Sequence, residues 1–203
     1  MKIARIASIL KKEKQVFLYN TADDVQWIGD GNALYPLFDF RALCLDEDSL
    51  FAILGIPENQ RDKFHYDSLF MPDTISVKDR DPAENQLDSG SMTINTGGRS
   101  LLPLRTQKGL VFIDHKYLSP ISSVMEVVEL YERISPSGEI YIAVKAGFML
   151  TGLIMPVKDA ISKSFVNTIK DIADQCAMAL EIMEDDLRSQ EQPQLHLVGD
   201  DDI

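Results

Sequence analysis

Apolar side chains recur every three or four residues through the last part of this sequence, from about Asp159 to Leu187. They are Ile161, Phe165, Ile169, Ile172, Cys176, Leu180, Met183 and Leu187. This period predicts an amphipathic helix over residues 158–188. At about 1.5 Å per residue the helix would be on the order of 40 Å long, which is more than one small sheet needs to cover.

A helix of this length has two ways to bury its apolar face. It packs across two lobes of its own chain, or its far end pairs with a second subunit. The second possibility predicts that the chain forms a dimer or a ring. The candidate oligomer contacts are then the central apolar residues of the helix: Ile169, Ile172, Cys176, Leu180 and Met183.

An acidic tail follows at residues 189–203. The chain has a net charge of −12, and the last twenty residues carry half of it. They contain seven acidic side chains and one basic side chain, Arg188. Residues 190–194 have the composition of a disordered linker, and residues 195–203 form a short acidic and apolar peptide that another protein could bind. A solubilising tail without a partner is the alternative. The candidate partner-peptide residues are Asp200, Asp201, Asp202 and Ile203.

The first 77 residues predict an N-terminal α+β lobe. Its opening segment, residues 2–12, fits a helix by its apolar period and also fits a strand. Three short strands are expected next, and the Asp30-Gly31 pair supplies the tight turn of an antiparallel meander. Asp46 is a good N-cap for a short helix after them. The expected strands are 16–20, 25–29 and 33–37, and the expected helix is 46–54.

Residues 78–91 hold one large apolar side chain, Leu87, and predict a polar loop or a boundary between two lobes. The second lobe, residues 92–157, has the order β-α-β-β-β. The fold class that follows is α+β: antiparallel β-sheets with short helices in two lobes, then the long C-terminal helix and the disordered acidic tail. The main elements expected in the second lobe are strands at 110–113, 127–134, 139–146 and 148–155 and a short helix within 115–125.

Composition places the chain among ordinary globular proteins. It has 203 residues, 45% of them hydrophobic, which is enough for a real core. No apolar run reaches the roughly 18 to 20 residues of a membrane span, and the first residues do not resemble a signal peptide. We therefore expect a cytoplasmic protein with no membrane partner. Cys44 and Cys176 are expected to be two buried or half-buried free thiols.

Known catalytic and cofactor signatures are missing from the sequence. It contains no phosphate-binding G-x-x-x-x-G-K-[ST] loop, no G-x-G-x-x-G, and neither H-E-x-x-H nor paired C-x-x-C. The three histidines, His65, His115 and His196, leave few ways to build a Ser-His or Cys-His system. Asp114 is expected to cap a helix rather than to form an acid/base pair with His115. We assign no catalytic residue, no metal and no cofactor.

Basic side chains gather at the start of the chain. Lys2, Arg5, Lys11 and Lys12 fall within twelve residues, and phosphate contacts require cations grouped in this way. They are candidate DNA contacts. A solvated helix face without a ligand is the alternative.

In residues 110–158 a strand leads to Tyr117-Leu118, three further strands follow, and the last ends in Met155-Pro156. This order resembles the last part of a bacterial DNA sliding clamp. The first lobe has a similar order, a helix and three strands, so the resemblance implies an internal repeat. It also implies a ring of subunits around duplex DNA, in which Lys2, Arg5, Lys12 and Lys116 face the phosphates.

These features predict a non-enzymatic binding protein, either clamp-like or another accessory factor of DNA metabolism. One alternative is an adaptor or inhibitor that binds another protein through the C-terminal helix and the acidic tail. The other is an enzyme of a family without recognisable motifs. The mass of the particle in solution separates a ring, a dimer and a monomer.

Overall fold

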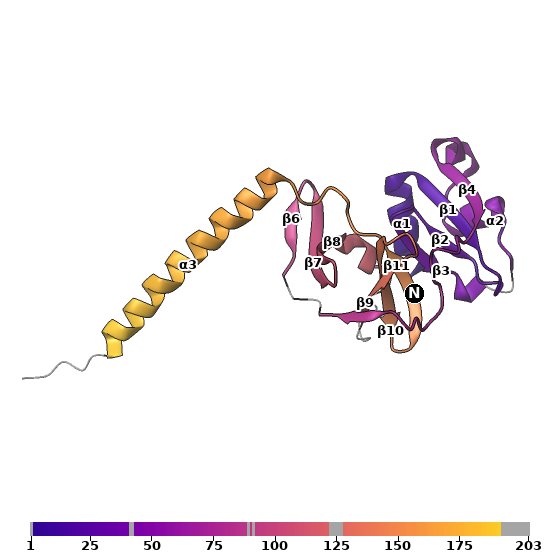
Figure 1. Ribbon diagram of the computed structural model, residues 1–203. Coiled ribbons are helices and arrows are strands. Elements are labelled where there is room, and N and C mark those ends of the chain that lie inside the picture. Colours follow the sequence, from indigo (N-terminus) through magenta and orange to yellow (C-terminus); the bar gives the residue numbers. More distant parts are fainter. Residues whose placement is uncertain (1, 41–42, 89, 91, 122–127, 192–203) are drawn as a thin grey trace, which may run out of the picture. The chain divides into compact units, whose positions relative to one another are not determined.

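The computed structural model describes residues 2–40, 43–88, 90, 92–121 and 128–191, and the side chains of the last helix up to Arg188. It divides into two units, residues 1–157 and residues 158–203, and each is described by itself. The first unit is an α+β body with two sheets, and the second contains one long helix (Figure 1). The predicted α+β class is correct.

An eight-stranded sheet forms the centre of the first unit, with the strand order β4-β1-β2-β3-β11-β10-β9-β5. All neighbouring pairs are antiparallel except β1 and β4, which are parallel. The strands are β1 (Gln15–Asn20), β2 (Trp27–Gly29), β3 (Ala33–Pro36), β4 (His65–Phe70), β5 (Asn85–Leu87), β9 (Val128–Ile134), β10 (Ile140–Ala146) and β11 (Met149–Ile154).

The two halves of this sheet share one order of elements. Helix α1 (Ile3–Glu13) precedes the meander β1-β2-β3, and the 3-10 helix η3 (His115–Leu118) precedes the meander β9-β10-β11. The helix-plus-three-strand order expected in both halves is therefore present. The meanders meet where β3 pairs with β11, with Leu34 opposite Leu153 and Ala33 opposite Ile154. Segments 120 residues apart in the sequence thus belong to one sheet.

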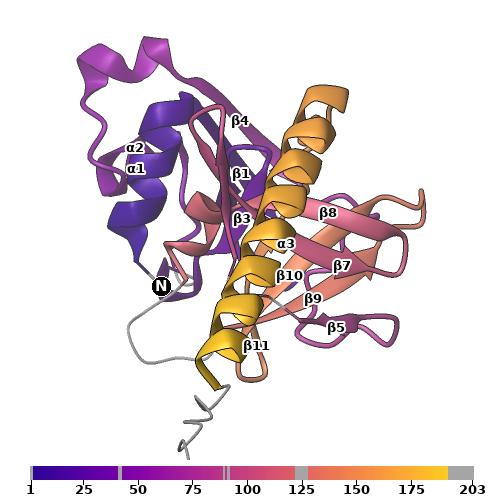
Figure 2. The ribbon, with the colours of Figure 1, turned by 90° about the vertical axis from the view of Figure 1, so that its left-hand side faces the viewer.

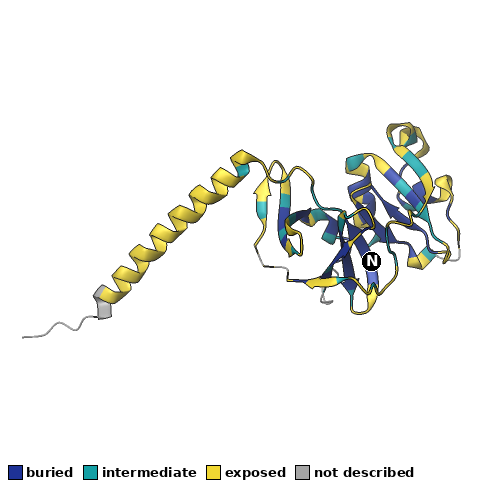
Figure 3. Ribbon diagram, in the orientation of Figure 1, coloured by how far each residue is buried: buried dark blue, intermediate teal, exposed yellow. Residues whose placement is uncertain are grey.

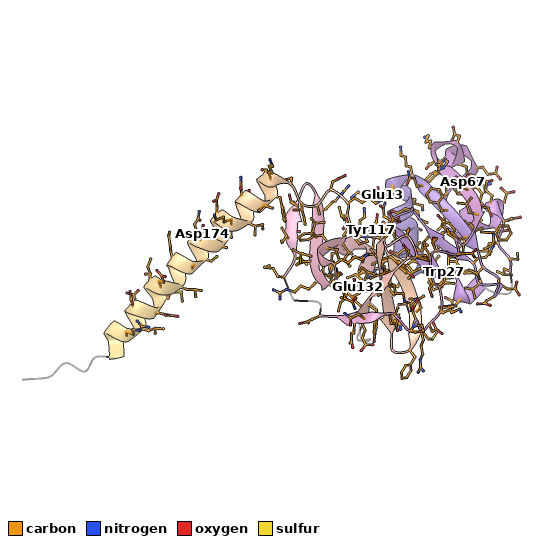
Figure 4. The ribbon with its side chains drawn as sticks, viewed as in Figure 1. Glu13, Trp27, Asp67, Tyr117, Glu132 and Asp174 are labelled. Atoms are coloured by element: carbon orange, nitrogen blue, oxygen red, sulfur yellow. The ribbon has the colours of Figure 1, made fainter. Side chains whose placement is uncertain are left out.

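A second sheet contains β6 (Ile94–Thr96), β7 (Arg99–Thr106) and β8 (Gly109–Asp114), all antiparallel (Figures 1 and 2). Its inward residues join the main core together with α1, with α2 (Glu47–Ile53) and with one face of the large sheet. Glu132, labelled in Figure 4, ties the two sheets together, because its Oε2 accepts a 2.9 Å hydrogen bond from the Gln107 amide. The remaining 3-10 turns are η1 (Phe38–Phe40) and η2 (Glu58–Lys63).

The opposite face of the large sheet has its own apolar cluster. Alternation along β10 sends Ile142 and Val144 to the main core, and Tyr141 and Ala143 to this second cluster. The chain between β4 and β5 crosses that face, and its apolar side chains Met71, Ile75 and Val77 pack against the cluster. Segment 78–91, predicted as a polar loop or a boundary, contains β5, and the large sheet has strands from both sides of this segment.

Local sequence explains the short helices. The ambiguous opening segment is helical, and its residues Ile6, Ala7, Ile9 and Leu10 form the buried face. Asp46 caps α2 as predicted, since its Oδ1 accepts a 2.9 Å hydrogen bond from the Ser49 amide.

Helix α3 (Lys163–Glu191) is the long helix that the periodicity predicts. Its 29 residues correspond to about 43 Å at 1.5 Å per residue. No described helix is long and apolar enough to cross a membrane.

The expectation that the two thiols are buried or half-buried is wrong, because both Cys44 and Cys176 are exposed.

The hairpin of β2 and β3 requires glycine at position 29, the last residue of β2. A Cβ atom there would lie 1.8 Å from the carbonyl oxygen of Ala33, which is backbone and cannot move away. We predict that Gly29→Ala lowers the free energy of unfolding by about 3 kcal/mol, at the upper end of the range for overpacking. Gly90→Ala is the matched control, because a Cβ atom at position 90 meets nothing within 4 Å. Urea unfolding followed by circular dichroism measures both, and equal stability of the two variants would contradict the described hairpin.

Candidate functional site

A continuous apolar stripe on α3 remains exposed. The stripe runs from Phe165, which is half-buried, to Leu187, and its other large members have exposed fractions between 37% for Ile169 and 60% for Leu180, Met183 and Leu187. Figure 3 shows almost all of α3 in the colour of exposed residues. The five residues predicted to be oligomer contacts, Ile169, Ile172, Cys176, Leu180 and Met183, all belong to this stripe.

Two further apolar side chains of α3 lie off the stripe. Met178 is 65% exposed and Ile182 is 63% exposed. At about 100° per residue both point to the side of the helix opposite Cys176. They match stripe residues in size and exposure, and differ in the face of the helix that they occupy.

The charges of α3 are distributed unevenly along its length. Lys163 and Lys170 are the only charged side chains in its first eight residues. Residues 181–188 contain four acidic side chains, Glu181, Glu184, Asp185 and Asp186, against one arginine. Arg188 lies 3.8 Å from both Glu184 and Asp185, in exposed pairs that contribute little to stability. The helix thus has a basic first third and an acidic last third.

A basic face is present on α1. Arg5, Lys11 and Lys12 are exposed there, on the side opposite the buried Ile6 and Leu10. Arg5 also anchors the helix, because its Nη1 donates a 2.5 Å hydrogen bond to the carbonyl of Ser119. Three of the predicted DNA contacts therefore share one exposed helix face.

The other two predicted DNA contacts lie differently. Lys2 is half-buried, and its backbone amide donates to the carbonyl of Pro120 at 3.0 Å. Lys116 on η3 forms an ion pair with Glu13, with 2.7 Å between Nζ and Oε1, and lies 3.5 Å from Asp114. Its charge is already balanced by these two carboxylates. Figure 4 shows Glu13 and the neighbouring Tyr117 on the two elements that this ion pair joins.

The residues predicted to form the partner peptide lie outside the described residues. They are Asp200, Asp201, Asp202 and Ile203.

The helix cap expected at Asp114 is present. Its Oδ1 accepts a 3.1 Å hydrogen bond from the Lys116 amide at the start of η3.

A half-buried carboxylate, Glu84, between two buried cations was not foreseen from the sequence. Arg133 and Lys145 are 1% and 4% exposed. The Arg133 Nη2 lies 2.7 Å from Glu84 Oε2, and Lys145 Nζ bonds the other oxygen of the same carboxylate. Burial would raise the pKa of Glu84, but the hydrogen bonds from Lys145 and Arg133 outweigh it and hold this pKa below its usual value. The sequence signal for this cluster was a charged residue at an otherwise apolar, inward position of a strand: Arg133 in β9 and Lys145 in β10.

A second buried polar group links the turn between β2 and β3, β3 itself and η3. Tyr117 donates a 2.7 Å hydrogen bond to Asp30 Oδ2, and Tyr35 donates a 2.8 Å bond to the carbonyl of Tyr117. Asp30 Oδ1 accepts from the amides of Asn32 and Ala33. Burial and then the Asp30 carboxylate raise the pKa of Tyr117, so this phenol stays protonated as a donor. All these groups satisfy one another, which identifies a structural network.

Two of the open pockets on the body are lined by described residues. One has a volume of about 470 Å³ and is lined by Arg80, Glu84, Tyr131, Lys145 and Phe148, among others. The other, of about 560 Å³, is lined by Asp24, Trp27, Phe38 and neighbouring residues. Neither contains a histidine.

His65 instead lies on exposed β4, with its Nε2 2.9 Å from Asp67 (labelled in Figure 4). Among the described residues, no three His, Cys, Asp or Glu side chains are grouped so as to hold a metal ion.

Comparison with protein-family models, with curated proteins and with solved structures finds no match to this chain. The surfaces above are therefore the basis for inferring function.

Glu84 has a predictable role in stability. Replacing it by glutamine leaves Arg133 and Lys145 buried without a negative partner, and we predict a loss of about 3 to 5 kcal/mol in the free energy of unfolding at pH 7. The matched control, Glu58→Gln on exposed η2, should change this free energy by less than about 0.5 kcal/mol.

The pH dependence follows from the lowered pKa of Glu84. Its stabilisation is complete above the ordinary pKa of 4.5 and is lost as the pH falls through the lower pKa of the folded state. The difference in stability between wild type and Glu84→Gln should therefore shrink below about pH 4. Urea titrations between pH 3 and 7 measure it, and a difference that is constant over this range would contradict the ionised cluster.

Proposed function

We propose that this protein is a non-enzymatic binding protein that associates with itself through the apolar stripe of α3. The observation that carries the proposal is the exposure of five large stripe residues along α3: Ile169, Ile172, Leu180, Met183 and Leu187. Monomeric proteins rarely expose a contiguous apolar patch of this kind. A second helix with the same stripe would bury it.

The energetics of helix formation support the same proposal. An isolated helix is marginal in water, and helices in proteins gain most of their stability from packing an amphipathic face. The stripe lies along most of a 29-residue helix, so that α3 needs a packing surface of similar length. A second copy of α3 supplies one.

Two methionine substitutions test this association. Met183→Glu places a charge in the stripe, and we predict that it weakens self-association by about 100-fold or more, because an unpaired buried charge costs about 3 kcal/mol. Met178→Glu makes the same chemical change at a similarly exposed position on the other side of the helix, and it should leave the association intact. Light scattering over a concentration series measures the mass of each variant.

The wild-type chain should have about twice its mass of 22.8 kDa. A wild-type monomer at all concentrations would overturn the proposal. So would a wild-type dimer that both variants weaken equally, because the stripe would then have no special role.

Duplex DNA is a second candidate ligand, supported by the exposed cations of α1. Arg5, Lys11 and Lys12 present positive charge on one helix face, and phosphate contacts of this kind are nonspecific and salt-dependent. The resemblance to sliding clamps is consistent with this role, since both halves of the sheet follow the helix-plus-three-strand order. In a clamp the mechanism is topological: a ring of subunits encircles the duplex.

We predict that the double substitution Lys11→Glu with Lys12→Glu weakens the binding of duplex DNA at low salt without abolishing it. Arg105→Glu makes the same change of charge at one exposed position of β7, away from α1, and should retain binding. If two phosphate contacts are lost, the slope of log K against log salt falls by about 2. Fluorescence anisotropy measures both, and a wild-type protein that does not bind DNA at low salt would rule out this candidate.

A further inference from the structure

The stripe of α3 has an internal symmetry that bears on how two copies would pair. This inference rests on the proposed self-association and concerns its geometry. Phe165 and Leu187 each lie eleven residues from Cys176, Ile169 and Met183 each lie seven, and Ile172 and Leu180 each lie four. The apolar positions therefore read the same in both directions from Cys176.

Such a pattern is self-complementary when two helices run in opposite directions. A two-fold axis at Cys176 would place Ile172 opposite Leu180 of the second copy, Ile169 opposite its Met183, and Phe165 opposite its Leu187. A shift to another antiparallel register would leave apolar residues beyond the end of the stripe on the other helix. This register is the one that buries the whole stripe.

The spacing also indicates the shape of the pair. The steps from Phe165 to Cys176 are four, three and four residues, and the same steps recur from Cys176 to Leu187. Eleven residues in three turns correspond to about 3.67 residues per turn, close to the 3.6 of a straight α-helix. The stripe therefore stays on one side of α3 along its length, and two straight helices can remain in contact without a left-handed supercoil.

The charges distinguish the two directions of pairing. In a parallel pair the acidic last thirds of both helices, each with Glu181, Glu184, Asp185 and Asp186, would lie together and repel. In an antiparallel pair the basic first third of one helix lies beside the acidic last third of the other.

One cross-helix pair follows from the helical angles. Lys170 and Glu184 flank the stripe on the same side, six residues before and eight residues after Cys176. In the antiparallel pair, Lys170 of one copy and Glu184 of the other are therefore offset by two residues along the helix axis. This offset is about 3 Å, which these long side chains can span. Lys170 of each copy can thus meet Glu184 of the other, and the symmetry provides this pair twice.

From the spacing and the charges together we infer that α3 pairs with a second copy of itself in the antiparallel direction, with the two-fold axis at Cys176. The surface is the stripe Phe165 to Leu187, and the partner is an identical helix. The helix dipoles then also oppose each other, which favours the same direction.

Engineered cysteines test direction and register in the full-length chain. In a background with Cys44→Ser and Cys176→Ser, one variant carries Ile169→Cys and another carries Met183→Cys. Antiparallel pairing about position 176 predicts that mild oxidation crosslinks the two variants when they are mixed, and that neither forms a crosslinked dimer alone, because disulfides require Cα atoms within about 7 Å. The Cys44→Ser chain, which keeps Cys176, should crosslink to itself by the same argument.

Each outcome has a definite meaning. Crosslinking of each variant alone, without preference for the mixture, would show parallel pairing and overturn the inference while leaving self-association intact. A dimer by light scattering in which none of these positions crosslinks would overturn the register, again without affecting the proposed function. A monomer by light scattering would overturn both. Circular dichroism of each variant confirms that α3 remains helical, and the native Cys176 crosslink tests the pairing without an added cysteine.

Discussion

Pairing of β3 with β11 is the contact on which the body of this protein depends. It joins two antiparallel meanders, distant in sequence, into one eight-stranded sheet. Because the sheet is continuous, one of its faces supports a single core with α1, α2 and the smaller sheet, and the other supports the chain that leads to Glu84. The ion cluster of Glu84 with the buried Arg133 and Lys145 and the exposed basic face of α1 both owe their positions to this sheet.

Much of this fold follows from local sequence signals, and the remainder depends on contacts that are distant in sequence. The meander after α1, the cap at Asp46 and the long helix α3 were predicted, because turn residues, capping residues and apolar period act within a few residues. Strands β4, β5 and β7 were not. Strand β4 is exposed along most of its length and lies at a sheet edge, so it lacks the apolar alternation of a strand.

The candidate surfaces show the same division between local and distant signals. The stripe on α3 was predicted residue by residue, since helical spacing alone determines it. The basic side chains at the positions proposed for DNA contact lie in different environments: Arg5, Lys11 and Lys12 share an exposed face, whereas Lys116 forms an ion pair with Glu13, 103 residues away in sequence. Burial of Cys44 and Cys176 was wrongly expected, because the apolar character of cysteine does not reveal whether a partner covers it.

The central claim is that α3 is stabilised by a second copy of itself, and hydrogen exchange of its backbone amides at several protein concentrations tests this most directly. The account predicts that the α3 amides exchange slowly at high concentration and much faster once dilution dissociates the pair, while the core amides of residues 1–157 do not change. Exchange in α3 that is independent of concentration would contradict it. Such a result would mean either that the helix is packed within its own chain or that nothing covers its apolar stripe.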